Sequence, residues 1–165
     1  MNNVILIGMP GCGKSTIGVI VAKRLGYRFV DTDLLIQEKE NKRLFEILRD
    51  NGNDYFVETE NKVVSALKAE KTVIATGGSV VFGKEAMQNL KRLGRVVYLR
   101  VPLCEIEKRV NNLETRGVLM NDGQTLADIF TERTPLYEMY ADLTVDATLS
   151  LAENAIEIEQ ALEQK

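Results

Sequence analysis

The stretch Val4-Ile5-Leu6-Ile7-Gly8-Met9-Pro10-Gly11-Cys12-Gly13-Lys14-Ser15 decides the fold. Its first four residues are a short apolar run that predicts a buried strand. After the stretch, apolar residues recur at helical spacing, at Ile17, Ile20, Val21 and Leu25. The eight residues from Gly8 to Ser15 fit the pattern G-x-x-x-x-G-K-[ST] at every fixed position. A strand, a glycine-rich turn and a helix in this order predict a phosphate-binding loop, and a chance match by an ordinary turn is the alternative.

Each residue type in this loop has a physical reason. Gly11 and Gly13 allow backbone conformations that turn successive N–H groups into one concavity, where phosphate oxygens accept them. The following helix adds the positive end of its dipole. Lys14 is expected to reach the β and γ oxygens of a nucleotide, and the Ser15 hydroxyl can bind Mg²⁺. Cys12 is interpreted as a small residue that contributes its N–H, with a redox role as the alternative.

Beyond the loop, apolar runs of strand length alternate with segments of helical period. Four further strands are predicted at 28–30, 72–76, 95–99 and 143–145. Helical stripes lie between and after them: Phe56, Val63, Val64 and Leu67; Leu103, Ile106, Val110 and Leu113; and Leu151, Ala155, Ile158 and Leu162, behind a Ser150–Glu153 capping box. Such alternation predicts an α/β fold of three layers, α/β/α, around a five-stranded parallel sheet. We expect a single domain over residues 1–165, with a mobile lid at about 111–125; a plain surface loop is the alternative there.

Composition narrows the function. The 165 residues are 45% hydrophobic and 27% charged, and 21 Lys and Arg against 24 Asp and Glu give a net charge of −3. That balance disfavours a non-specific grip on nucleic acid but permits small anionic ligands. The absence of histidine excludes Ser-His-Asp and Cys-His catalysis. Two cysteines make no disulfide scaffold. Since no leader and no apolar stretch of about 18 residues occurs, we expect a cytoplasmic protein without membrane contact.

Two groups of residues follow predicted strands, at the edge where parallel sheets bind ligands. Asp31 and Asp33 come after the second strand, so one is placed to act on Mg²⁺ through water and the other on an acceptor hydroxyl; a turn with a helix N-cap is the alternative. Thr76-Gly77-Gly78-Ser79 follows the third strand. Its paired glycines would let backbone N–H groups hold a carboxylate or phosphate, unless they only form a strand-to-helix turn.

Three arginines lie in or around the predicted lid: Arg109, Arg116 and Arg133. The arginine fork donates two parallel hydrogen bonds to planar oxyanions. Phosphoryl transfer also needs positive charge near the γ-phosphoryl oxygens, which a closing lid would supply. Each arginine taken alone could equally be a solvated surface charge.

Together these residues resemble the shikimate kinase family, over essentially the whole chain. The resemblance rests on Gly8–Ser15, Asp31-x-Asp33, the spacing of Phe56 and Glu60, Gly77-Gly78, Arg109, Arg116, Arg133-Thr134-Pro135-Leu136-Tyr137 and Ala141. It implies transfer of the ATP γ-phosphoryl group to the 3-hydroxyl of shikimate, with Mg²⁺, in the chorismate pathway to the aromatic amino acids. A monomer is expected.

The resemblance also implies roles. The catalytic residues would be Lys14, Asp33 and Arg116; the nucleotide would contact Gly11, Cys12, Gly13, Lys14, Ser15, Thr16, Arg109 and Arg116. Asp31 would hold Mg²⁺ through water, together with Ser15. Asp33 would orient the acceptor hydroxyl, and Arg133 with the Gly77-Gly78 backbone would bind the shikimate carboxylate.

Three departures from the family pattern stand out. Val57 replaces an arginine that is a second clamp on the carboxylate in the family, Ser79 replaces the third glycine of a Gly-Gly-Gly turn, and Gly117 replaces a proline after the lid arginine, which predicts a looser lid. Val57 could alternatively extend the apolar face of its helix, since it lies seven residues before Val64. Two other functions therefore stay open: a related small-molecule kinase with another acceptor, and a nucleotide-binding module without efficient transfer.

Overall fold

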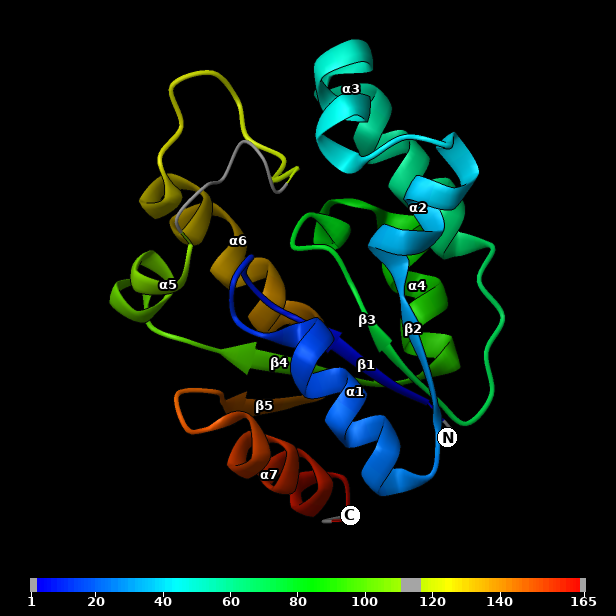
Figure 1. Ribbon diagram of the computed structural model, residues 1–165, viewed down its shortest axis with the longest axis vertical. Helices are drawn as coiled ribbons and strands as arrows, with labels where there is room; N and C mark the ends of the chain where they lie inside the picture. Colours follow the sequence, from blue (N-terminus) through cyan, green and yellow to red (C-terminus); the bar gives the residue numbers. More distant parts are fainter. Residues whose placement is uncertain (1–2, 111–116, 164–165) are drawn as a thin grey trace.

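The computed structural model describes residues 3–110 and 117–163. Its centre is a five-stranded sheet in the order β2-β3-β1-β4-β5 (Figure 1). The strands are β1 (Asn3–Ile7), β2 (Arg28–Asp31), β3 (Thr72–Ala75), β4 (Gly94–Arg100) and β5 (Leu143–Asp146). Every neighbouring pair is parallel. The predicted fold class is therefore confirmed.

The helices cover both faces of this sheet. In the described ranges they are α1 (Lys14–Leu25), α2 (Thr32–Glu40), α3 (Leu44–Ser65), α4 (Lys84–Leu93), α5 (Leu103–Arg109), α6 (Leu126–Tyr140) and α7 (Leu151–Glu163), with a 3₁₀ turn, η1 (Val80–Phe82). Helices α1 and α7 pack together on the near face in Figure 1, and α3 packs on α4 on the far side. Strand β1 is followed by α1 on one face of the sheet, whereas its neighbour β3 is followed by α4 on the other face. A crevice therefore forms between the carboxyl ends of these two strands.

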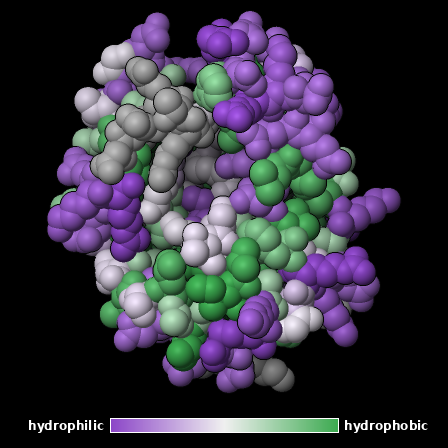
Figure 2. Space-filling model, in the orientation of Figure 1, coloured by the Kyte–Doolittle hydropathy of each residue, from purple (hydrophilic) through white to green (hydrophobic). Residues whose placement is uncertain are grey.

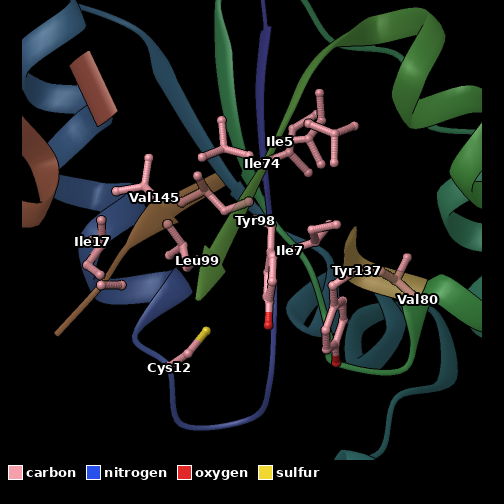
Figure 3. Close-up of a cluster of buried hydrophobic side chains, with 14 of the residues drawn as sticks. Ile5, Ile7, Cys12, Ile17, Ile74, Val80, Tyr98, Leu99, Tyr137 and Val145 are labelled. Carbon is pink, nitrogen blue, oxygen red and sulfur yellow. The ribbon is translucent and has the colours of Figure 1, made fainter. Parts of the chain in front are cut away.

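Burial follows from this layering. All five residues of β1 are buried, on both faces of the sheet, as expected for a central parallel strand. Figure 3 shows side chains from β1, β3, β4 and β5 meeting α1 and α6 in the main core. A second, smaller cluster joins α2 and α3 to the segment after residue 116; its buried members are Ile36, Leu44, Ile47, Phe56 and Leu119. This cluster attaches the end of the predicted lid to the α2–α3 pair.

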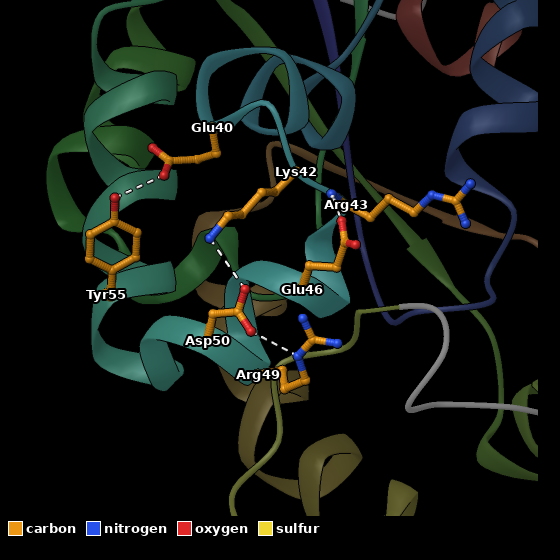
Figure 4. Close-up of polar contacts among 7 residues, drawn as sticks. All are labelled: Glu40, Lys42, Arg43, Glu46, Arg49, Asp50 and Tyr55. Atoms are coloured by element: carbon orange, nitrogen blue, oxygen red, sulfur yellow. Dashed lines mark hydrogen bonds and ion pairs between the residues drawn. The ribbon is translucent and has the colours of Figure 1, made fainter.

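The surface differs between the two ends of the view. Hydrophilic side chains cover the upper right of Figure 2, over α2 and α3, whereas apolar side chains gather low on this face, over α1 and α7. At the α2–α3 corner, Lys42 and Arg49 pair with Asp50, and the Tyr55 hydroxyl donates to Glu40 (Figure 4). These pairs are solvent-exposed, so water and salt screen them and they add little to stability. Within the described ranges, none of the helices has the length and apolar character needed to cross a membrane.

Two helices were not among the helical stripes named from the sequence. They are α4, which lies between two predicted strands, and α6, which carries Pro135 in its interior. The helix predicted from Leu103 ends at Arg109, and the predicted stripe member Leu113 is outside the described residues. Arg133, which was predicted in or around the lid, lies within α6.

Candidate functional site

The phosphate-binding loop has the backbone that its glycines predict. Gly11 and Gly13 have φ values of 81° and 97°, in the region that glycine adopts at little cost. Gly13 is the residue before the first turn of α1, so the free N–H groups of that turn open onto the loop. A Cβ on Gly11 would lie 2.3 Å from the Val110 side chain, so the end of α5 closes over the loop. The loop therefore combines an anion-binding concavity with the positive end of a helix.

Lys14 points back into this loop. Its ammonium donates to the carbonyl oxygens of Gly8, at 2.7 Å, and Met9, at 2.8 Å, and the side chain is buried. Cys12 is fully buried beside it, with its sulfur 3.6 Å from the ammonium nitrogen. The loop thus holds one desolvated positive charge at its centre, where phosphate oxygens would bind.

Asp31 joins the loop to helix α2. One of its oxygens accepts the Ser15 hydroxyl at 2.6 Å, and the other accepts the Asp33 N–H at 2.9 Å, which caps α2. The helix-cap alternative is thus realised, and it coexists with a contact to the loop. The Ser15 hydroxyl and the Asp31 carboxylate are hard oxygen donors, which suit Mg²⁺.

The half-buried Asp33 and the buried Glu60 form an acidic pair beside Gly77. A Cβ on Gly77 would lie 2.7 Å from Asp33 Oδ1 and 2.8 Å from Glu60 Oε1, so both oxygens face the same small space. Burial, with the nearby Asp31 charge, raises the pKa of Asp33 to about 6, against an opposing effect of Lys14. Burial raises the pKa of Glu60 to about 7. Both groups can therefore exchange protons near neutral pH.

Arg133 is the other charged group of the site. It is 2% exposed and donates to the Leu119 carbonyl, while its guanidinium lies 5.4 Å from the centre of the Phe82 ring. Its Nε is buried without a hydrogen-bond partner in the described part of the chain, as is Glu60 Oε1. Buried polar atoms are almost always paired in native proteins, so the unpaired Nε of Arg133 marks a place for a polar ligand.

One cavity of about 220 Å³ joins Lys14, Asp33 and Arg133. Its walls include the loop, Asp33, the turn after β3, the segment after residue 116, and Arg133; the lining residues are Pro10, Gly11, Lys14, Asp33, Phe56, Thr76, Gly77, Gly78, Ser79, Gly117, Val118, Leu119 and Arg133. The Tyr137 hydroxyl donates to the Gly78 carbonyl at 2.6 Å, which fixes the turn after β3. Within the described residues, the Gly77 and Gly78 amides donate to no other group, so they remain available to an anion.

The other predicted site residues lie as follows. Val57 is absent from the cavity wall; it lies half-buried on α3, packs on the second cluster and lines a neighbouring surface groove with Phe82. Thr16 is exposed in the first turn of α1, and Arg109 is half-buried at the end of α5, next to Val110. Arg116 lies outside the described residues.

Gly117 follows the undescribed stretch and is buried. A Cβ there would lie 2.4 Å from the Leu44 Cβ, and its φ is 67°. Glycine at this position thus allows the chain to pack closely on the start of α3.

Glu60 is the site residue that sequence reasoning missed. It entered the argument only through its spacing from Phe56. The signal that could have found it is a carboxylate on the apolar face of a helix, four residues after Phe56 and four before Val64, both of which are buried. A carboxylate is almost never fully buried unless it is paired, so such a position calls for a partner elsewhere in the fold.

A phosphate-binding loop, a Ser–Asp pair suited to Mg²⁺ and a small cavity with buried acids and a buried arginine define an ATP-dependent kinase of the P-loop fold that acts on a small molecule. A family model described as shikimate kinase matches residues 10–163. The chain belongs to the shikimate kinase family.

Named relatives and solved structures agree with this assignment. A shikimate kinase of Clostridium botulinum is 43% identical over 142 residues, which cover 84% of each chain. One from Persephonella marina is 33% identical over 146 residues, or 88% of each chain. The structure resembles that of the Acinetobacter baumannii shikimate kinase in complex with shikimate, with a TM-score of 0.91 and 30% identity over 100% of this chain and 96% of that one.

Proposed function

We propose that this protein transfers the γ-phosphoryl group of ATP to the 3-hydroxyl of shikimate, a step of the chorismate pathway. The observation that carries the proposal is the cavity shared by the phosphate-binding loop, Asp33 and Arg133. A buried guanidinium with a free Nε fits a carboxylate, and a carboxyl group beside the loop fits a hydroxyl that must attack a phosphoryl group.

The residues divide the work by chemistry. The loop N–H groups and Lys14 would neutralise the charge that the γ-phosphoryl oxygens carry in the transition state. Asp33 would orient the acceptor hydroxyl and accept its proton, a role that its raised pKa of about 6 supports. Arg133 and the Gly77 and Gly78 amides would hold the shikimate carboxylate. Arg109 beside the adenine and Arg116 over the phosphoryl group stay predictions.

Mg²⁺ fits the Ser15–Asp31 pair. The Ser15 hydroxyl would be a direct ligand, and the Asp31 carboxylate would hold the ion through water. When bound, the ion would offset the negative charge of the β and γ phosphates. The capping contact to Asp33 N–H would keep the Asp31 carboxylate aimed at the loop.

We further propose that the chain acts as one domain, with residues 111–125 as its lid. The contacts of Leu119 with the α2–α3 cluster and of Arg133 with the Leu119 carbonyl support this, because they connect the lid segment to the acceptor site. The monomeric state stays a prediction. The cytoplasmic location stays a prediction.

A coupled assay of ADP release at saturating MgATP, with and without shikimate, tests the function. We expect shikimate-dependent turnover with a micromolar to low-millimolar KM. The absence of Val57 from the cavity wall and the presence of Ser79 there favour a second candidate, a kinase for a different hydroxy acid. Turnover with such an acid and none with shikimate would establish it. Tight ATP binding with no acceptor-dependent turnover would instead indicate a binding module.

A further inference from the structure

The acceptor cavity contains a serine whose proton has a fixed destination. Ser79 is 5% exposed and lines the cavity, and its hydroxyl donates to Glu60 Oε2 at 2.7 Å. Glu60 is 2% exposed and lies behind the cavity wall rather than in it. An ionised carboxylate can only accept hydrogen bonds. The Ser79 proton is therefore directed away from the cavity as long as Glu60 carries its charge.

A hydroxyl oxygen has two lone pairs besides its proton. While the Ser79 hydroxyl donates its hydrogen bond to the ionised Glu60, the Ser79 oxygen can only accept a hydrogen bond from a ligand in the cavity. We propose that Ser79 determines acceptor specificity in this chain, by presenting a fixed hydrogen-bond acceptor to one hydroxyl of the substrate. A glycine, which the family pattern has at this position, offers no such group. The inference rests on the proposed function, since it takes the acceptor to be a polyhydroxy acid.

The charges around Glu60 make this arrangement depend on pH. Asp33 on α2 raises the pKa of Glu60, whereas Ser79, Arg133 on α6 and Lys14 on α1 lower it, and burial dominates, giving about 7. Below that pH the protonated Glu60 can donate to Ser79, whose own proton then turns toward the cavity. Affinity for the acceptor should then fall as the pH drops through about 7. Titration of Asp33 would affect variants with and without Ser79 alike, so only the difference between them reports on Ser79.

The first test compares Ser79→Ala and Ser79→Gly with a matched control, Ser65→Ala. Ser65 lies on the same helix as Glu60 and donates to the Lys62 carbonyl, far from the cavity. Loss of one neutral hydrogen bond should raise the KM for shikimate about 2- to 12-fold, with smaller changes in kcat and an unchanged KM for ATP. Ser79→Thr should keep the wild-type KM. An unchanged KM for shikimate in both Ser79 variants, with intact thermal unfolding, overturns the proposal.

The second test identifies the hydroxyl. Wild type and Ser79→Ala are each assayed with shikimate, 4-deoxyshikimate and 5-deoxyshikimate. One deoxy analogue should bind the wild type about 2- to 12-fold more weakly than shikimate does, and should show no such loss in Ser79→Ala. Equal losses in the two proteins for both analogues contradict the inference. The pH dependence of the KM near 7 should likewise be weaker in Ser79→Ala and in Glu60→Gln than in wild type.

The third test needs no turnover and so separates this inference from the proposed function. Carbon-13 NMR of the side-chain carboxyls, with Glu60→Gln to assign the signal, gives the titration midpoint of Glu60 in the ligand-free protein. The midpoint should be higher in Ser79→Ala, because the serine hydrogen bond favours the ionised form. An unmoved midpoint rejects the Ser79–Glu60 contact even if shikimate is phosphorylated. Absence of turnover with shikimate in the wild type rejects the proposed function, and the midpoint then still decides on the contact.

Discussion

The two sides of the cavity are built differently. The nucleotide side is one continuous stretch, Gly8–Ser15, whose binding groups are mostly backbone N–H groups. The acceptor side is assembled from side chains on separate elements: the half-buried Asp33 on α2, and the buried Glu60 on α3, Ser79 after β3 and Arg133 on α6. A backbone site is fixed by local conformation, whereas a side-chain site is fixed by the packing of the whole fold. Substitutions can therefore alter the acceptor side without disturbing the nucleotide side.

The departures from the family pattern follow this division. Gly8–Ser15 meets its motif at every fixed position, while Val57 and Ser79 lie on α3 and in the turn after β3. Phosphate chemistry is the same for every acceptor, but the acceptor contacts decide which molecule is phosphorylated. We infer that specificity in this chain resides in the acceptor side, and the following experiments break or sharpen that contrast.

The largest expected effect is at Asp33, where the two sides meet. Asp33→Asn should lower kcat by about 10²- to 10⁴-fold, because the amide cannot accept the proton of the attacking hydroxyl. ATP affinity, measured by calorimetry, should stay close to wild type, because the loop is untouched. A near-normal kcat would mean that Asp33 only forms the start of α2 and takes no part in catalysis. A loss of ATP binding would show that the nucleotide side and the acceptor side are not separable.

Glu60→Gln should show how much folding stability is lost by burying the Glu60 carboxylate in the acceptor side. The pKa of Glu60 rises from its ordinary value of 4.5 to about 7 on folding, so the folded chain holds a proton that the unfolded chain releases. Stability therefore falls as the pH rises through this window, by up to about 3 kcal/mol. Denaturant unfolding at pH 5 and pH 8 should show a larger loss in the wild type than in Glu60→Gln, where only the raised pKa of Asp33 still contributes. Parallel pH profiles in the two proteins would contradict the raised pKa of Glu60.

These two acids also show how far the sequence could predict the site. Asp33 was found because it belongs to a local motif after a strand, and the five strands were found because their apolar runs are local as well. Glu60 gains its role through Ser79, which is 19 residues away, and through Asp33, which belongs to another helix. No local pattern contains such a contact.

Arg133 illustrates the same limit for secondary structure. Its type and its neighbours in sequence suggested an anion ligand in or around the lid, and its segment was not among the helical stripes named from the sequence. The structure places it inside α6, with its guanidinium buried against Phe82 and the Leu119 carbonyl. Tertiary packing can outweigh the local helix preference of a segment, which only the fold reveals.

Arg133→Lys tests the carboxylate contact itself. Lysine keeps the positive charge but cannot donate two parallel hydrogen bonds, so the KM for shikimate should rise about 10- to 150-fold. Steady-state kinetics should show little change in the KM for ATP. An equal rise in both KM values would instead indicate that the contact of Arg133 with the Leu119 carbonyl controls the closed arrangement of both sites.

The smallest expected effect is at Val57. Its side chain packs with Leu48, Val63 and Phe82 on the second cluster. Val57 lines a groove beside the cavity rather than the cavity itself, so in Val57→Arg the new side chain would have to reach from that groove to a carboxylate in the cavity. A charge-assisted hydrogen bond is worth about 1.5–3 kcal/mol, but ordering the long side chain costs up to about 2 kcal/mol, so we expect the KM for shikimate to fall by no more than about tenfold.

The matched control is Val57→Met, which fills the same apolar position without a charge. It should leave the KM unchanged, so that a lower KM in Val57→Arg is due to the guanidinium. If Val57→Arg leaves the KM unchanged or raises it, the acceptor side of this chain has no place for a second cation. The carboxylate would then depend on Arg133 and the Gly77 and Gly78 amides alone, and the acceptor side would differ from the family pattern in its contacts as well as in its sequence.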